Sequence, residues 1–144
     1  MAKGNGMLKL LKPCEGTITS KFGFRTKPKA GWHSGLDIAN KLGTSILSCY
    51  KGSVVFAGLR GGYGQCVIIK HDTLGNVWTL YGHLNSIDCN VGDKVMQQQR
   101  IGTMGSTGYS TGPHVHLECR IGFNGILACR NPVQYLEGLE WLRS

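Results

Sequence analysis

The sequence lacks several features that would assign a protein to a class at once. None of its 144 residues lies in a run approaching the ~20 consecutive apolar residues of a membrane-spanning helix. The first residues lack the apolar centre and the small-residue cleavage site of a signal peptide. We therefore expect no membrane insertion. Either the protein reaches its place of action by another route, or the sequence begins after a removed signal.

Paired metal-binding cysteines are also lacking, because no Cys-x-x-Cys sequence occurs. Six cysteines would permit a disulfide framework, but the chain is larger than typical disulfide-stapled domains, and nothing supports an oxidising compartment. We predict six free, mostly buried thiols that pack as small apolar side chains. They are Cys14, Cys49, Cys66, Cys89, Cys119 and Cys129.

Acidic residues are scarce, since 8 Asp and Glu stand against 16 Lys and Arg, a formal charge of +8. Most of the excess lies in residues 1–30, where Glu15 is the only acidic residue. A basic surface attracts polyanions of any kind. An array of base-stacking aromatics is missing, so we expect no nucleic-acid partner. We predict a basic N-terminal arm over residues 1–14, whose leucines could dock on the rest, and one domain over residues 15–144.

Glycine is abundant, and its 22 residues punctuate short runs rich in Val, Ile, Thr and aromatics. This pattern predicts an all-β fold, an antiparallel sheet or sandwich, rather than alternating strands and helices. One short C-terminal helix is expected from Pro132 to about Leu142, because apolar residues recur there at helical spacing. The candidate strands span residues 16–20, 45–49, 53–57, 65–70, 77–82, 94–97 and 114–121.

Four of the five histidines fall in three short glycine-rich motifs. The motifs are Gly-Trp-His33-Ser-Gly-Leu-Asp37, Leu-Tyr-Gly-His83-Leu and Gly-Pro-His114-Val-His116-Leu-Glu118. Imidazole and carboxylate groups together can hold a zinc ion, and further imidazoles can transfer protons beside it. Four imidazoles and one carboxylate exceed a three-ligand catalytic zinc site by two groups, enough for a general base and a transition-state stabiliser. The combination indicates an enzyme.

Spacing alone leaves the individual roles open. Glycines around His33 and Asp37 argue against a helix and predict a loop that curls around a metal. His114 and His116 share one face of a strand, so both could bind a metal, or one could bind it while the other faces water. The remaining histidine, His71, is interpreted as structural or surface-exposed.

Glu118 lies on the same predicted strand face as the two preceding histidines. No His-Glu-x-x-His motif supplies a glutamate base. Glu118 could therefore be a general base, a hydrogen-bond acceptor behind a ligand imidazole, or an ordinary strand carboxylate.

The three motifs, in this order, resemble the signature segments of the lysostaphin/LytM-type zinc metalloendopeptidases of bacterial cell walls. The segments that begin at Gly52, Gly61 and Val91 are also similar to that family. The resemblance implies Zn²⁺ as cofactor, with His33, Asp37 and His116 as ligands. It makes His83 and His114 the catalytic pair, and implies a β-sheet floor with a groove between loops.

The resemblance also implies a substrate, the peptide cross-links of bacterial peptidoglycan. The protein would act in the cell wall, after secretion, during host lysis or on a virion, and would be a monomer unless it is part of a virion. A phage or prophage origin fits the compact sequence. In the glycine-rich loop of residues 105–112, we expect Tyr109 and Thr111 to contact the substrate.

Two departures from the family pattern and one alternative function accompany this resemblance. Trp32 stands where many relatives have a second histidine that is not a ligand. The segment of residues 121–130 is longer than usual and could form a hairpin beside the groove. The alternative is a non-catalytic relative that binds the cell wall or regulates another hydrolase, but such domains are expected to lack ligand residues, and all five positions are intact here.

Overall fold

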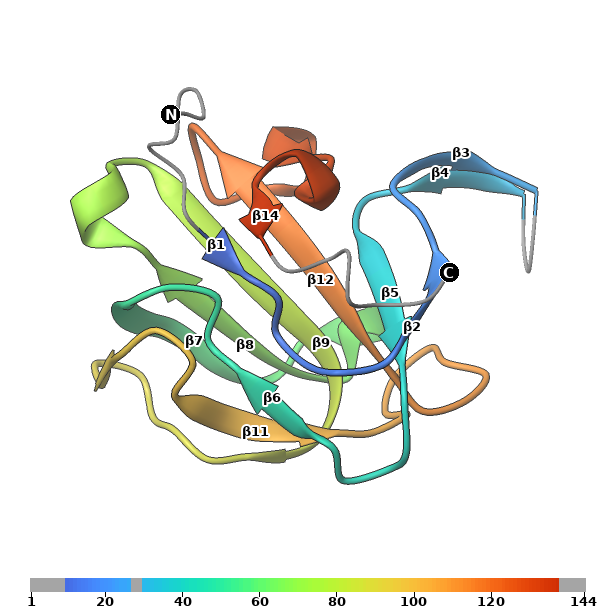
Figure 1. The fold of residues 1–144 in the computed structure, drawn as a ribbon, viewed down its shortest axis with the longest axis horizontal. Coiled ribbons are helices and arrows are strands. Elements are labelled where there is room, and N and C mark those ends of the chain that lie inside the picture. Colours follow the sequence, from blue (N-terminus) through green and yellow to red (C-terminus); the bar gives the residue numbers. More distant parts are fainter. Residues whose placement is uncertain (1–9, 27–29, 138–144) are drawn as a thin grey trace.

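Short antiparallel strands make up most of the regular structure in the computed structural model, which describes residues 10–26 and 30–137 (Figure 1). The main sheet has ten strands, in the order β10-β7-β8-β9-β12-β5-β2, with β6, β11 and β13 attached off this path. Their bounds are β2 Thr17–Ser20, β5 Leu36–Ala39, β6 Ser45–Leu47, β7 Gly52–Leu59, β8 Gln65–Lys70, β9 Val77–Ile87, β10 Lys94–Val95, β11 Arg100–Met104, β12 His114–Ile121 and β13 Cys129–Arg130.

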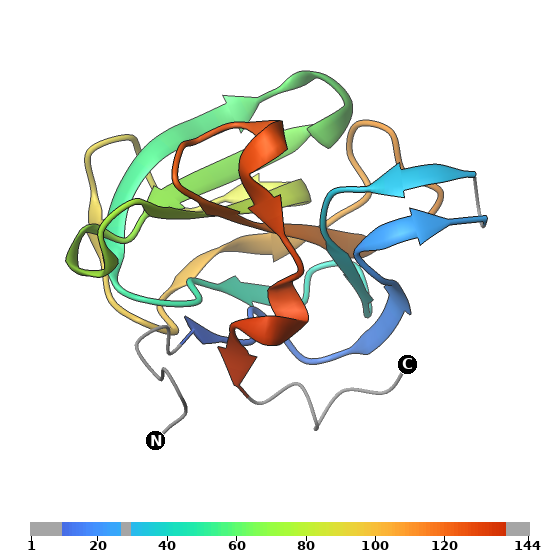
Figure 2. The same ribbon diagram turned by 90° about the horizontal axis from the view of Figure 1, so that it is seen from above.

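Two small sheets complete the fold. β3 (Gly23–Arg25) and β4 (Gly31–His33) form an antiparallel ribbon that extends beyond the edge of the main sheet in both views (Figures 1 and 2). β1 (Leu10–Leu11) pairs in parallel with β14 (Leu136–Glu137). The all-β antiparallel prediction is confirmed. No helix in the described residues is long and apolar enough to cross a membrane.

The apolar core lies between the strands on the main path of the sheet and the attached strands β6 and β11, which pass in front of it in Figure 1. Leu10 and Cys14, from the predicted arm, are buried in this core. All six cysteines are free and buried, as predicted. The strands contribute Leu36, Ile38, Ile46, Val67, Ile69, Tyr81, Ile101, Met104, Val115 and Leu117.

The long strand β12 places chemistry on the face opposite this core. Its alternate residues Val115 and Leu117 enter the core, because side chains alternate across a strand. His116, Glu118 and Arg120 therefore share the other face, where all three are buried. β12 lies between β5 and β9, so its polar face occupies the middle of the sheet.

The predicted C-terminal helix is wrong in its described part. Pro132–Gln134 form a single 3-10 turn, and the chain then continues as β14. Leu136 is buried, whereas Val133 is 45% exposed, so the apolar repeat does not form one buried face. Pairing with β1 satisfies the backbone in place of helical hydrogen bonds. The remainder of the predicted helix lies outside the described residues.

The strand predictions are confirmed for β8 and β12 to the residue, and the others differ at their ends. The sequence patterns missed β5, β11, the β3–β4 ribbon and the two-residue strands β1, β13 and β14. The remaining short 3-10 turns are η1 Gly61–Tyr63, η2 Asp72–Leu74 and η3 Ile126–Ala128.

Candidate metal centre

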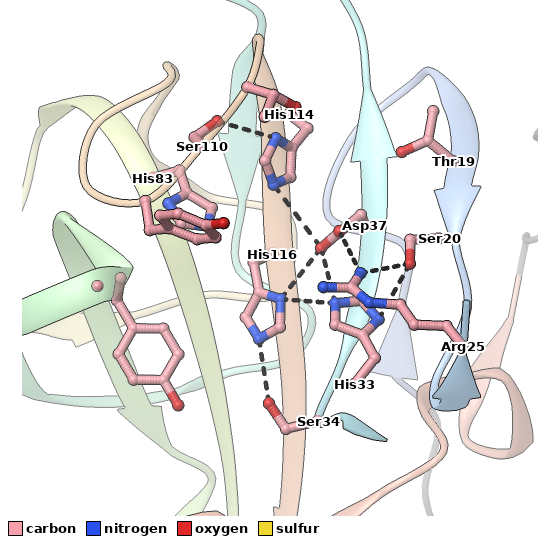
Figure 3. Close-up of a pocket in the computed structure, with 14 residues that line it drawn as sticks. Thr19, Ser20, Arg25, His33, Ser34, Asp37, His83, Ser110, His114 and His116 are labelled. Atoms are coloured by element: carbon pink, nitrogen blue, oxygen red, sulfur yellow. Dashed lines mark hydrogen bonds and ion pairs between the residues drawn. The ribbon is translucent and has the colours of Figure 1, made fainter. Parts of the chain in front are cut away.

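Three side chains from three strands bring one ligand atom each to a common point (Figure 3). His33 Nε2 lies 3.2 Å from His116 Nδ1 and 3.3 Å from Asp37 Oδ1, and the last two atoms are 3.0 Å apart. Ligand atoms of a tetrahedral zinc with bonds of about 2.0–2.1 Å stand roughly 3.3 Å apart. The triangle therefore fits one face of a zinc coordination sphere, and it is the one such group of three in the described residues.

Strand pairing, rather than a loop, creates this triangle, so the loop predicted for residues 33–37 is wrong. His33 ends β4 and Asp37 lies in β5, where it pairs with His116 of β12. Gly35 joins the two strands, and a Cβ there would collide with the carbonyl oxygen of Leu117 and come within 2.9 Å of the His116 ring. The glycine is needed for this close approach, not for a left-handed turn.

The second nitrogen of each ligand imidazole has its own acceptor. His33 Nδ1–H donates to the carbonyl oxygen of Lys21 at 2.9 Å, and His116 Nε2–H donates to Glu118 Oε2 at 2.9 Å. Such acceptors set the tautomer and the ring orientation of metal-binding histidines. They leave one lone pair of each ring directed at the centre.

His83 and His114 face the same cavity and follow the same rule. Their Nδ1–H groups donate to the carbonyl oxygens of Thr107, at 2.7 Å, and Gly112, at 2.8 Å. His114 Nε2 lies 3.8 Å from Asp37 Oδ1, and the two rings are 4.7 Å apart between centroids. Each Nε2 can therefore accept a proton from a group bound between the rings and the ligand triangle.

A backbone irregularity aims His83 at the site. Gly82 is the last residue of β9 that pairs with β12, and Leu84 pairs with β11. His83, between them, has φ = +63°. This left-handed conformation is unusual for a side-chain-bearing residue and is concentrated at functional sites. Burial lowers the pKa of His83 to about 4, so its imidazole is neutral at pH 7.

Glu118 is fully buried behind the ligand triangle. Besides His116, it accepts hydrogen bonds from Ser34 Oγ at 2.6 Å and Tyr63 OH at 2.7 Å, and it pairs with Arg120 at 2.7 Å. Burial alone would raise the pKa of Glu118, but hydrogen bonds, first from His116, outweigh it and hold the pKa at about 2. The carboxylate is ionised and its oxygens are engaged.

The ligand cluster favours positive charge. Although burial opposes ionisation, hydrogen bonds from His116 and His33 hold the pKa of Asp37 well below its usual range. Burial likewise opposes protonation of His116, but Asp37 and Glu118 raise its pKa to about 9. Two carboxylates that face one imidazole stabilise a cation there. A bound metal ion would supply that charge and displace the proton.

The cluster opens into a cavity of about 410 Å³. Tyr109 and Thr111 line it, as do all five residues of the predicted site. One wall is the loop of residues 105–112 packed against the turn at η1: Tyr109 N–H donates to the carbonyl of Gly62 at 2.8 Å. Ser110 of the same loop also lines the cavity, and the sequence reasoning missed the other lining residues Thr19, Ser20, Arg25, Ser34, Gly62 and Tyr63.

The segment of residues 121–130 does form a hairpin, because β13 pairs with β12. None of its residues lines the cavity. Instead, Asn124 accepts a hydrogen bond from Arg120 at 2.8 Å, and Cys129 Sγ contacts Glu118 at 3.3 Å. The hairpin thus supports the buried ion pair behind the site.

An antiparallel sheet that carries a His–Asp–His cluster and two further imidazoles on one face is the arrangement that the resemblance to LytM-type metallopeptidases implied. The chain belongs to peptidase family M23, whose family model matches residues 31–127.

The chain is similar in sequence to two relatives over most of its length. The chain is 43% identical over 107 residues to DD-carboxypeptidase/endopeptidase Mpg of Neisseria meningitidis serogroup B (strain ATCC 13091 / M2091), covering 72% of the chain and 24% of Mpg. It is 36% identical over 126 residues to murein hydrolase activator NlpD of Escherichia coli (strain K12), covering 86% of the chain and 30% of NlpD. The chain thus covers less than a third of the length of each of these relatives.

The fold is similar to the solved catalytic domain of the antimicrobial peptidase lysostaphin from Staphylococcus simulans. The TM-score is 0.77 at 29% sequence identity, over 83% of this chain and 90% of that domain.

Proposed function

We propose that this chain is a zinc-dependent endopeptidase that hydrolyses peptide cross-links of bacterial peptidoglycan. The observation that carries the proposal is the triangle of ligand atoms at 3.0–3.3 Å beside two imidazoles whose second nitrogens face the same cavity. His33, Asp37 and His116 would hold the zinc. When bound, zinc would polarise the scissile carbonyl and bring the pKa of a water ligand down to about 7.

His83 and His114 are proposed to carry out the proton transfers of the reaction. Both donate Nδ1–H to a backbone carbonyl, so each presents Nε2 to the cavity. His83 is neutral at pH 7 because burial lowers its pKa to about 4, and a neutral imidazole can accept the proton of the attacking water. The resulting His83 imidazolium now carries a proton on Nε2, which it can donate to the oxyanion and then pass to the departing amine. His114 Nε2 is a second acceptor for a proton of the attacking water.

Glu118 is proposed to position His116 rather than to act as a base. Its oxygens face His116, Ser34, Tyr63 and Arg120, and its side chain is fully buried. We expect Glu118→Gln to weaken zinc affinity roughly 10- to 100-fold, the usual effect of losing such an acceptor. Zinc titration combined with turnover at saturating zinc checks this. Loss of most turnover with unchanged zinc affinity would instead identify Glu118 as the base.

The substrate assignment rests on the family and on the names of relatives. Mpg is named a DD-carboxypeptidase/endopeptidase, and lysostaphin is named an antimicrobial peptidase. We extend this chemistry to residues 15–144 as one metallopeptidase domain, with residues 1–14 as its N-terminal extension. Tyr109 and Thr111 would contact the peptide. The protein would act in the cell wall, as a secreted, host-lysis or virion-associated enzyme.

A non-catalytic regulator is the second candidate, because the relative NlpD is named a murein hydrolase activator. The intact triangle and both cavity-facing imidazoles favour the enzyme.

Digestion of purified peptidoglycans of different cross-link type tests the two candidates. The enzyme is expected to generate new amino termini, identified by mass spectrometry, and to bind one zinc per chain. His116→Ala is expected to lose both zinc and turnover. Turnover that survives both zinc chelation and His116→Ala would refute the proposed mechanism. Wild-type protein that releases no amino termini from any peptidoglycan, yet stimulates a second hydrolase, would identify a regulator.

A further inference from the structure

Arg25 is the one lysine or arginine among the described residues that line the cavity. It lies in β3, where pairing with β4 sets Gly23 opposite His33 and Arg25 opposite Gly31. Alternation along the two strands places Arg25 and His33 on the same face of the ribbon. The Arg25 side chain reaches over His33 toward Asp37 (Figure 3).

One end of the guanidinium is fixed. Arg25 Nη1 donates to Ser20 Oγ at 2.6 Å and lies 3.7 Å from Asp37 Oδ2. Among the described residues, Nη1 makes both polar contacts of the guanidinium. Nε and Nη2 form the other edge of the planar fork, which matches a carboxylate through two parallel hydrogen bonds. The side chain is 25% exposed, so that edge is accessible from the cavity.

The charges of the site favour an anionic partner for this edge. Glu118 lies behind the site and is balanced by Arg120 at 2.7 Å. Asp37 is the only acidic residue among the described residues that line the cavity, and Arg25 offsets its charge. A divalent metal ion held by the triangle would leave the cavity with an excess of two positive charges, which attracts an anionic group.

We propose that Arg25 is a carboxylate-binding residue that selects peptides with a free carboxylate on the residue next to the scissile bond. This inference rests on the proposed function. Because Arg25 contacts Asp37, one of the three residues proposed to hold the zinc, a carboxylate bound by Arg25 would lie next to the scissile bond. In this proposal, the carboxylate belongs to the residue that supplies the departing amine. Two sources share this chemistry: the terminal α-carboxylate of a peptide, and the side carboxylate of a diamino-dicarboxylic acid within a cross-link.

The test compares peptides that differ only in a carboxylate or a carboxamide at this position. One pair varies the terminal group, and a second pair varies the side group of the cross-linking residue. Dissociation constants are measured by fluorescence anisotropy with the zinc-loaded His83→Asn variant, and KM and kcat are measured with the wild type. We expect the acid to be preferred roughly 10- to 100-fold in one pair, the range for charge-assisted hydrogen bonds. The pair that shows the preference identifies the source.

Arg25→Gln is made both in the wild type and in the His83→Asn variant. It should reduce the preference for the acid peptide over the amide peptide to about one, because only binding of the acid peptide weakens, and the zinc content should stay unchanged. Arg100→Gln is the matched control, because Arg100 also pairs with an aspartate, Asp88, at 2.7 Å, outside the cavity. It should leave the ratio as in the wild type. Equal binding of acid and amide in both pairs would overturn the inference, as would an equal loss for both peptides in Arg25→Gln.

The binding arm separates this inference from the proposed function. Acid-selective binding without turnover by the wild type would leave the carboxylate site standing and refute the enzyme. Turnover without any acid preference would do the reverse.

Discussion

At the scale of single residues, the site depends on what lies behind each imidazole. His33 presents Nε2 to the centre because its Nδ1–H is bound by a backbone carbonyl, whereas His116 presents Nδ1 because its Nε2–H is bound by Glu118. The two imidazoles therefore present different nitrogens to the centre. For His33 the acceptor is a backbone carbonyl on a neighbouring segment, and for His116 it is a side chain two residues further along the same strand face. The position of the acceptor decides which nitrogen of each ring remains to face the centre.

His83 provides a direct test of the proposed proton transfer. We choose His83→Asn because asparagine tolerates the left-handed φ of +63° at this position. Turnover should fall roughly 10²- to 10⁴-fold, the usual contribution of a general acid–base group. Zinc content and the midpoint of thermal unfolding should stay close to wild type. A variant with normal turnover would remove His83 from the mechanism.

His71 is buried in the structure, which agrees with its interpretation as a structural residue. We expect it to make the free energy of unfolding depend on pH. It is fully buried, donating Nδ1–H to the carbonyl of Lys51 at 2.9 Å and accepting from Thr79 Oγ1 at 2.8 Å. Burial lowers its pKa below the ordinary 6.5. The unfolded chain therefore binds a proton that the folded chain does not, so the stability contribution present above pH 6.5 is lost as the pH falls.

Urea unfolding of the wild type and His71→Gln across this pH range measures the effect. The free-energy difference between the two proteins should shrink steadily below pH 6.5. A constant difference would show that His71 does not titrate on unfolding.

At the scale of elements, the cavity wall is held by two glycines in contact. Gly64 and Gly108 have left-handed φ values of +67° and +73°. A Cβ on Gly108 would overlap the backbone nitrogen of Gly64, and one on Gly64 would overlap the carbonyl carbon of Thr107. Only glycine permits the loop of residues 105–112 to approach η1 this closely.

Gly108→Ala should therefore destabilise the fold by roughly 2–4 kcal/mol, because backbone strain and overpacking add. Peptide turnover should fall with it, since the wall that carries Tyr109 must move. Gly61→Ala is the control: its φ of +53° is also left-handed, but nothing lies within 4 Å of an added Cβ. It should cost about 1 kcal/mol. Chemical denaturation measures both, and equal losses would contradict the crowding argument.

At the scale of the whole molecule, the core and the candidate metal centre lie on opposite faces of one sheet. Because the core is apolar and buried, the sheet should remain folded without zinc. Chelation should abolish turnover and lower the thermal midpoint, since a ligand that binds only the folded state stabilises it. The strand signal in circular dichroism should persist, and added zinc should restore turnover. Unfolding on chelation would show instead that the metal is a structural requirement.

The sequence predicted part of the fold because some signals are local. Strands β8 and β12 were predicted to the residue, since each contains β-branched residues and begins directly after a glycine or a proline, Gly64 or Pro113. β5 was missed because Gly35 was interpreted as a loop residue, although its role is to admit β12. The C-terminal helix was wrong because pairing with β1 depends on a segment more than a hundred residues away.

The candidate site was likewise predicted only in part from the sequence. The five residues singled out by chemistry and spacing do converge on one cavity, and their individual roles remain predictions. Arg25 and Tyr63 were missed because no local pattern marks them. Arg25 reaches Asp37 only through the β3–β4 ribbon, and Tyr63 reaches Glu118 only across the sheet.

By itself, the sequence determined the all-β pattern and predicted the class of chemistry, because period-two alternation and side-chain type are properties of short segments. The tertiary structure alone decided which atom of each imidazole faces the centre, that Glu118 supports His116, and that Arg25 joins the cavity. The physical reason is that ring orientation and ion pairing depend on acceptors brought within 3–4 Å by strand pairing between segments far apart in the chain.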